Sequence, residues 1–233
     1  MDKFHSEILS ELRKYFSEPN LFGAKYMGTK HPFLGVSVPV RRKIVKNFVK
    51  SHPNLTISEF IGLMASLSTS AKTHEELSIR GTLLEYLPKL RQQLDPKLLN
   101  YWLDYAHGWG EVDCICQSNF RAEELLGNWN TWSKLIKKFR RDENVHKRRA
   151  SLVLLTKPVG QSGDKRLSDL AFSSIELLKG EKDILITKAI SWLMRSLIEN
   201  HSKELERYII ENKETLSKIA LRETRRKLLT GKK

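Results

Sequence analysis

The sequence predicts an all-helical protein, and three observations lead to this fold class. Apolar residues recur at helical spacing from the start of the chain, with Phe4, Ile8, Leu12 and Phe16 on one face of the segment DKFHSEILSELRKYF. Signals that begin a helix recur about every twenty residues, as capping residues or first-turn prolines. No segment alternates convincingly between apolar and polar residues as a half-buried strand does.

The remaining helices follow in order along the chain. The next four helices begin either at a capping box, in which Thr is followed three residues later by Glu, or at a proline in the first turn. These starts are Pro39, Thr56 with Glu59, Thr73 with Glu76, and Asp95 with Pro96. Later helices are expected in WSKLIKKFRR, NVHKRRASLVLLTK, LSDLAFSSIELLKG, ILITKAISWLMRSLIEN, KELERYIIENKE and SKIALRETRRKLL. The Gly- and Pro-containing segment KPVGQSGDKR, residues 157–166, is expected to be a loop between repeats.

Helices that pair about every forty residues match the length scale of HEAT-type repeats. The chain has 233 residues, 40% of them hydrophobic, which is enough to bury a substantial core. We therefore expect residues 1–233 to form a single domain, a curved α-solenoid with a concave basic face. A globular helical bundle is the alternative.

The charge of the chain favours a polyanionic partner. Lys and Arg total 41 against 27 Asp and Glu, which gives a formal net charge of +14. Such an excess is typical of proteins that meet nucleic acid or an anionic membrane surface, and a basic protein without such a partner is the alternative. The first residues, MDKFHSEILSEL, do not resemble a signal peptide, and no apolar run approaches the length of a membrane span. We expect a cytoplasmic monomer that makes no membrane contact.

The cysteines and histidines give no pattern for a metal site. Cys114 and Cys116 are two residues apart, so on a helix they point to different faces and suit neither a disulfide nor a zinc pair. The seven histidines have no ligand spacing. We expect no metal and no cofactor, and we interpret the cysteines as small packing residues in a reducing compartment.

The segment GWGEVDCICQS, residues 108–118, carries a first candidate site. Trp109 and Asp113 are four residues apart and therefore share one face of a helix. A carboxylate is unusual on a helix buried in the core, and an indole is unusual on a helix exposed to solvent. Taken alone, the pair is more often a packed Trp beside an Asp that the helix dipole stabilises. The glycines on both sides of Trp109 predict that its position is loosened.

A second candidate lies in ILITKAISWLMRSLIEN. The core stripe of this helix is expected to contain Ile186, Ile190, Leu193 and Leu197. Lys188, Trp192 and Arg195 fall on the opposite side, where an outward indole between two cations is suited to nucleic acid. The alternative is that neighbouring helices bury both faces and Trp192 belongs to the core.

Cations also crowd two helix N-termini, where the macrodipole disfavours them. Lys147, Arg148 and Arg149 follow a helix start near Asn144, and Arg41, Arg42 and Lys43 follow Pro39. A helix N-terminus with added cations is suited to a phosphate group. Ion pairs with Asp142 and Glu143 are an equally good explanation for the cations near Asn144.

Together these segments resemble a known family. AKYMGTKHPFLGVSVPVRRKIVK, WGEVDCICQSNF, ENVHKRRASLVLL and LITKAISWLMRS are similar, in this order, to segments of the AlkD-type bacterial DNA alkylation repair glycosylases. The resemblance implies a curved solenoid of HEAT-like repeats whose concave face holds duplex DNA. It also implies excision of the cationic bases 3-methyladenine and 7-methylguanine.

The resemblance assigns roles residue by residue. It implies that Asp113 is the catalytic carboxylate, that Trp109 and Trp192 are the aromatic residues of the catalytic pocket, and that Tyr26 lies near the DNA. Arg149 is the implied phosphate ligand, with Arg148 adjacent to it. We add Arg42, Lys188 and Arg195 as expected DNA contacts from their positions described above.

The chemistry fits these residue types. A purine alkylated on a ring nitrogen is cationic and is already a good leaving group, so the remaining task is to stabilise the sugar as it becomes an oxocarbenium-like cation. The Asp113 carboxylate is suited to this task and to orienting the attacking water. Two other classes of function stay open. One is a HEAT-like protein that binds DNA structure without catalysis, and the other is a solenoid that binds protein.

Overall fold

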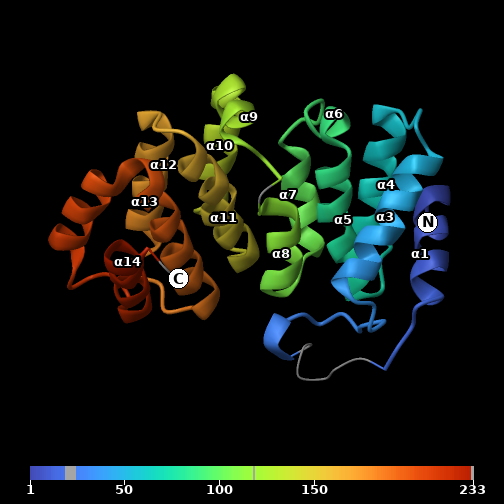
Figure 1. The fold of residues 1–233 in the computed structure, drawn as a ribbon, viewed down its shortest axis with the longest axis horizontal. Coiled ribbons are helices and arrows are strands. Elements are labelled where there is room, and N and C mark those ends of the chain that lie inside the picture. Colours follow the sequence, from blue (N-terminus) through green and yellow to red (C-terminus); the bar gives the residue numbers. More distant parts are fainter. Residues whose placement is uncertain (19–24, 118, 232–233) are drawn as a thin grey trace. The chain divides into compact units, whose positions relative to one another are not determined.

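The structure is a computed structural model that describes residues 1–18, 25–117 and 119–231. Every regular element in these ranges is helical, so the predicted all-helical class is confirmed (Figure 1). The chain divides into two compact units, Met1–Ile115 and Cys116–Lys233. Within each unit, helices two apart along the chain pack on each other, α3 on α5 and α11 on α13, as successive HEAT-like repeats do.

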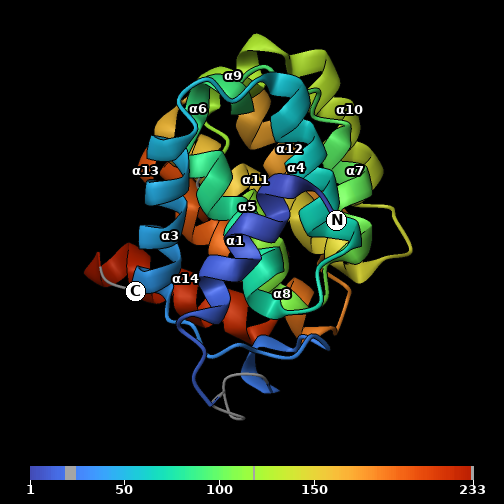
Figure 2. The ribbon, with the colours of Figure 1, turned by 90° about the vertical axis from the view of Figure 1, so that its right-hand side faces the viewer.

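The N-terminal unit contains a series of short and medium helices. They are α1 (Lys3–Arg13), α3 (Val38–Ser51), α4 (Ile57–Thr69), α5 (His74–Tyr86), α6 (Pro88–Arg91), α7 (Leu98–Trp102), the 3-10 helix η1 (Leu103–Tyr105) and α8 (Gly108–Cys116). In the end-on view of Figure 2, α1 lies between α3 and α4, and it packs on both.

The helix starts that the sequence predicts in this unit are confirmed at two capping boxes. Thr56 and Thr73 each form a complete capping box with the Glu three residues later, as predicted. The apolar face of α1 is confirmed at Phe4, Ile8 and Leu12, but Phe16 lies beyond the end of the helix and is 61% exposed. The predicted face therefore ends one turn earlier than expected.

The first turn of α5 contacts three neighbouring parts of the unit through consecutive residues. His74 Nδ1 lies 3.2 Å from the Glu111 carboxylate of α8. The Glu75 carboxylate accepts hydrogen bonds from the backbone N–H groups of Leu34 and Val36. Glu76 lies 2.9 Å from Nε2 of His5 in α1, and both side chains are almost fully buried. The contacts of Glu75 fix the segment 25–37, which connects to α3, against α5. His74 and Glu76 join α5 to α8 and α1.

The C-terminal unit contains longer helices. They are α9 (Ala122–Gly127), α10 (Trp129–Phe139), α11 (Val145–Gln161), α12 (Lys165–Leu178), α13 (Ile184–Asn212) and α14 (Lys218–Thr230). The central helix α11 packs on α9, α10, α12 and α13, and α14 packs on α13 (Figure 1). Asn144 caps α11 by accepting a hydrogen bond from the backbone N–H of His146, as the sequence indicated.

The loop predicted at residues 157–166 is present but is shorter than predicted, spanning residues 162–164. Helix α11 continues through Pro158 to Gln161, and only three residues separate it from Lys165. Side chains of α13 satisfy the carbonyl groups at this end: Asn200 donates to the Val159 carbonyl, and His201 Nε2 lies 3.0 Å from the Ser162 carbonyl oxygen. These tertiary partners favour a helical end that the local composition argued against.

The two helices predicted around residue 201 form one element. Helix α13 runs across both segments, with a kink at His201, whose backbone angles are φ −136° and ψ 29°. No helix among the described residues is long and apolar enough to span a membrane.

Candidate functional site

The first turn of α8 lies against the backbone of segment 25–37, and its glycines allow this approach. Gly108 has φ +73°, and a Cβ atom built there would lie 2.3 Å from the Met27 carbonyl oxygen. A Cβ atom on Gly110 would lie 2.5 Å from the Met27 methyl group. The expectation that these glycines loosen Trp109 is therefore wrong, because they allow a close packing contact on either side of it.

The indole of Trp109 is fixed by two contacts with Tyr26. Its Nε1–H group donates a hydrogen bond to the Tyr26 carbonyl oxygen at 2.8 Å. The two rings meet edge to face, with their centroids 5.3 Å apart and an interplanar angle of 83°. Tyr26 is 58% exposed, so its ring remains open to solvent beside the half-buried indole.

A buried carboxylate holds this arrangement together, and sequence reasoning missed it. Glu111 has no exposed surface and accepts hydrogen bonds from the Thr29 hydroxyl and, at 2.7 Å, from the His107 backbone N–H. Its Oε1 atom also lies 3.1 Å from His31 Nδ1 and 3.2 Å from His74 Nδ1. We call these five residues the Glu111 cluster. It joins α8 to segment 25–37 and to α5.

The protonation state of Glu111 follows from these contacts. Burial alone raises the pKa of a carboxyl group, but hydrogen bonds from His74, Thr29 and the His107 backbone outweigh it. The pKa of Glu111 is therefore below its ordinary value, and the side chain is a carboxylate. The only sequence signal was its place between Trp109 and Asp113.

Asp113 lies one helical turn after Trp109 on α8, on the same face. Its side chain is only 6% exposed. Helix α8 is held close to α5, because a Cβ atom on Gly81 of α5 would lie 1.7 Å from the Cys114 carbonyl oxygen. The backbone of α8 next to Asp113 is therefore held by close contact between two helices.

The cysteines of α8 are free thiols. The Cys114 thiol donates to the Glu111 carbonyl oxygen at 3.1 Å, and burial raises its pKa to about 11. A thiol with such a pKa is a poor nucleophile at neutral pH. These findings agree with the predicted packing role.

The two arginines at the start of α3 have partners inside the N-terminal unit. Both terminal nitrogens of Arg42 contact the Glu85 carboxylate, at 3.1 Å and 2.5 Å. Arg41 donates to the Ser78 hydroxyl, and burial lowers the pKa of its guanidinium. A DNA phosphate would have to compete with Glu85 for Arg42.

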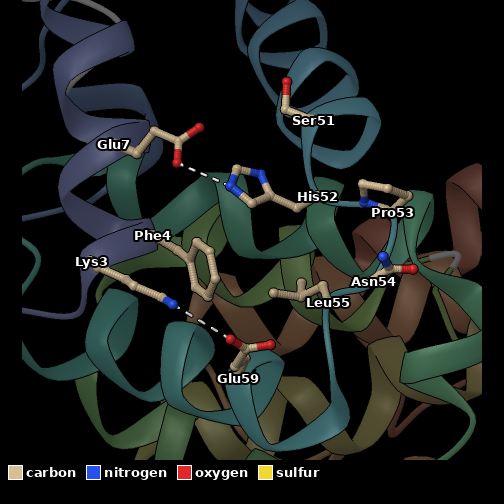
Figure 3. A pocket seen from close by; sticks show the side chains of 9 residues that line it. All are labelled: Lys3, Phe4, Glu7, Ser51, His52, Pro53, Asn54, Leu55 and Glu59. Carbon is tan, nitrogen blue, oxygen red and sulfur yellow. Dashed lines mark ion pairs between the residues drawn. The ribbon is translucent and has the colours of Figure 1, made fainter.

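A cavity of about 510 Å³ lies elsewhere in this unit, between α1, the end of α3 and the start of α4 (Figure 3). The charged groups at its rim form the pairs Lys3 with Glu59, at 3.5 Å, and Glu7 with His52, at 3.3 Å. None of the predicted site residues lines it.

In the C-terminal unit, Arg148 and Arg149 differ in their contacts. Arg148 binds the Glu181 carboxylate at 2.8 Å and 3.1 Å and donates to the carbonyl oxygens of Asp142 and Glu143. The structural explanation for the cations near Asn144 thus holds for Arg148, although its carboxylate partner is Glu181. Arg149 is 5% exposed and donates to the Leu185 carbonyl oxygen at 2.6 Å, which joins α11 to the start of α13.

The predicted outward face of α13 is only partly open. Lys188 is exposed and Trp192 is half-buried. Arg195 is buried, with 7% of its surface exposed, because α14 covers it and Glu223 binds its guanidinium. The expectation that Arg195 points outward is wrong, since the helix that follows in the sequence packs on this side.

Comparison with known proteins identifies the family. A family model described as DNA alkylation repair enzyme matches residues 8–228. The chain belongs to this family. Its function therefore lies in DNA repair, and the resemblance found in the sequence is confirmed at the level of the family.

One solved structure extends this result to the fold. It is described as a predicted DNA alkylation repair enzyme from Enterococcus faecalis, and it superimposes with a TM-score of 0.73 at 18% sequence identity. The match covers 90% of this chain and 94% of the other. At this identity the similarity shows the shared fold. No curated protein matches the chain.

The family leaves the roles of individual residues as predictions. Trp109, Asp113, Tyr26 and Arg42 belong to the N-terminal unit, and the other predicted site residues belong to the C-terminal unit. These others are Arg148, Arg149, Lys188, Trp192 and Arg195.

Proposed function

We propose that the protein is a monofunctional DNA glycosylase that hydrolyses the N-glycosidic bond of cationic alkylated purines, such as 3-methyladenine and 7-methylguanine, in duplex DNA. The observation that carries this proposal is the pairing of Trp109 and Asp113 on one face of α8, with the indole held by the Tyr26 carbonyl group. Membership of a DNA alkylation repair family supports the choice of substrate.

Asp113 is the catalytic carboxylate in this proposal. Alkylation on a ring nitrogen gives the purine a positive charge, so it departs as a neutral base without a general acid. The sugar meanwhile acquires oxocarbenium character, and a fixed carboxylate stabilises this charge more than it stabilises the ground state. Asp113 also orients the water that adds to the sugar carbon, and the proton that this water loses as the sugar hydroxyl forms is released to bulk water.

Trp109 contributes an aromatic face to the cationic nucleotide. Cation–π contact with Trp contributes about 0.5 to 2 kcal/mol, depending on how far the cation is desolvated. The hydrogen bond to Tyr26 fixes the indole before DNA arrives, so little rotamer entropy is lost on binding. Trp192 is proposed as the second aromatic contact.

The DNA backbone is bound by cations. Arg149 and Lys188 are proposed as phosphate ligands, in keeping with their places near the start of α11 and on the Trp192 side of α13. Arg42, Arg148 and Arg195 bind Glu85, Glu181 and Glu223, so each would add to DNA affinity only by exchanging its carboxylate for a phosphate. We further propose that residues 1–233 act as one DNA-binding domain and as a monomer.

The experiment is the release of free methylated purines from methylated duplex DNA, with the products identified by mass. Wild type and Asp113→Asn are compared with Asp169→Asn, which alters an exposed carboxylate on α12. We expect release by wild type and by Asp169→Asn, and a loss of about a hundred- to a thousandfold in Asp113→Asn with duplex affinity retained.

Two outcomes would contradict the proposal. Equal release by Asp113→Asn and wild type would exclude the carboxylate mechanism. No release by wild type, with salt-sensitive duplex binding intact, would favour a protein that recognises DNA structure without catalysis.

A further inference from the structure

We propose that the exposed face of α14 is an additional phosphate-binding surface for the backbone of the DNA substrate. This inference rests on the proposed binding of duplex DNA, but it concerns residues outside the site described above. The surface consists of Lys218, Arg222, Arg225 and Arg226, which we call the α14 stripe. All four side chains are exposed.

The four cations share a narrow face of the helix. At about 100° per residue, Lys218, Arg222, Arg225 and Arg226 fall within an arc of about 100°. From the first to the last, the stripe extends about 12 Å along the helix axis. None of the four forms a salt bridge within the described ranges.

The opposite face of α14 packs on α13. Ala220 and Thr224 have no exposed surface, and the Lys227 ammonium group donates to the Arg195 carbonyl oxygen at 3.0 Å. The helix therefore has a defined rotation about its axis, which directs the stripe outward.

The single acidic residue of α14 does not neutralise the stripe. Glu223 accepts hydrogen bonds from Arg195 and from the Ser191 hydroxyl, both on α13. Burial alone raises the pKa of Glu223, but these two partners outweigh it and lower the pKa. The charge of Arg222 also lowers the pKa of Glu223, but the hydrogen bonds of Glu223 are made with α13, so four cations against one carboxylate leave the stripe with a net positive charge.

Helix α14 packs on α13 close to the position of Trp192 in the sequence. Helix α14 joins α13 at Ser191 and Arg195, and Trp192 lies only about 60° from Arg195 around the axis of α13. Helix α14 therefore lies beside the side of α13 that carries Trp192 and Lys188, with the stripe on its outer face. A duplex whose damaged nucleotide contacts Trp192 would have neighbouring phosphates within reach of the stripe.

The spacing of the stripe fits nucleic acid better than a membrane. Each DNA strand carries one phosphate per roughly 3.4 Å of helix axis, so a stripe about 12 Å long matches three to four phosphates. A helix that binds a membrane surface needs an apolar face for the acyl region. On α14 only Leu229 is a highly exposed large apolar residue. Ile219, Leu221 and Leu228 are only partly exposed, so no continuous apolar face is open to an acyl region.

The test compares two triple variants that remove equal charge. Arg222→Ala/Arg225→Ala/Arg226→Ala alters the stripe, and Lys134→Ala/Lys137→Ala/Lys138→Ala alters three exposed cations of α10, which packs on α9 and α11. Kd for a 20-base-pair duplex is measured from about 50 to 200 mM salt. Alanine favours helix at all six positions, and thermal melting verifies that both variants fold.

The stripe variant should lose about two to three units of the slope of log Kd against log salt concentration, at about 0.9 per phosphate contact. Its affinity should fall by about tenfold or more, whereas the α10 variant should lose less than one unit of slope. An unchanged slope in the stripe variant, or the same loss in both variants, would overturn the proposal. Weaker binding to anionic phospholipid vesicles with no change in duplex affinity would overturn it as well.

Failure of this inference is distinguishable from failure of the proposed function. If wild type binds the duplex and releases methylated purines while the stripe variant equals it, only the stripe is excluded. If wild type shows no salt-dependent affinity for the duplex, both proposals fail.

Discussion

The indole N–H of Trp109 donates to the Tyr26 carbonyl oxygen, a hydrogen bond between residues 83 positions apart in the sequence. The contact exists because segment 25–37 lies directly on the first turn of α8. It ties the proposed nucleotide contact to a second, separate part of the chain. Changes on either side of this contact should therefore alter both stability and excision.

Gly108→Ala should destabilise the protein by about 2 kcal/mol or more, because it adds a methyl group at a positive φ against the Met27 carbonyl oxygen. Excision should fall as well, since segment 25–37 would have to move away from Trp109. Urea denaturation and the release of methylated purines provide the two measurements. Gly127→Ala is the control, since a Cβ atom there meets nothing within 4 Å. Equal stability of the two variants would contradict this account of Gly108.

Glu111→Gln should cost about 2 to 3 kcal/mol of folding stability, since the amide group replaces one acceptor with a donor beside groups that already donate. If the cluster positions Trp109 and Asp113, kcat for excision should fall further than duplex affinity. Denaturation and single-turnover excision would measure the two effects, with Glu123→Gln on the surface of α9 as the control. A variant with lower stability but unchanged single-turnover rate would limit the cluster to a structural role.

Folding stability should fall in acid through two separate groups. Burial, followed by the charge of the neighbouring His31, lowers the pKa of His107. In mild acid His107 therefore binds a proton in the unfolded chain but stays neutral in the folded chain. Stability therefore decreases as the pH falls below the ordinary histidine pKa of about 6.5. Glu111 has a lowered pKa, so its contribution is present above the ordinary Glu value and is lost as the pH falls through its folded pKa.

The two effects can be separated with His107→Asn, which keeps the backbone N–H that binds Glu111. Unfolding free energies measured between about pH 4 and 8 should lose the histidine contribution in this variant and keep the steeper loss at lower pH. A wild-type stability that rises on acidification from pH 7 to 6 would refute the assignment to His107.

Arg149→Ala should weaken duplex binding and reduce the salt slope by about one unit, which corresponds to one lost phosphate contact. Some loss of folding stability should accompany it, because Arg149 also donates to the Leu185 carbonyl oxygen. Lys157→Ala removes an exposed cation from the same helix and should change neither the salt slope of duplex binding nor the folding stability appreciably. Salt titrations that give Arg149→Ala the wild-type slope would exclude it as a phosphate ligand.

Sequence reasoning succeeded where the deciding interactions are local. The capping boxes at Thr56 and Thr73 join residues three apart, and the amphipathic pattern of α1 extends over a few turns. Such features depend only on residues that are close to one another in the sequence. The resemblance to a family was also reliable, because several segments had to match in the same order.

Sequence reasoning failed where a distant partner decides. Glu111 gave no signal beyond its place between Trp109 and Asp113, because Thr29 and His31 contact it from 82 and 80 positions away. Arg195 was expected on an open face, but α14 returns to cover it. Pro158 indicated a loop, yet side chains of α13 stabilise the helical end around it. Each error came from tertiary packing that no local pattern encodes.

The opening of α5 has a consequence for the evolution of the chain. His74, Glu75 and Glu76 follow one another in the sequence, yet each contacts a different neighbour, and Glu76 contacts His5 near the N-terminus. A descendant shortened at that end would leave the buried Glu76 carboxylate without its histidine partner. The first helix is therefore an integral layer of the N-terminal unit, and we expect gains and losses of sequence in this lineage to occur elsewhere.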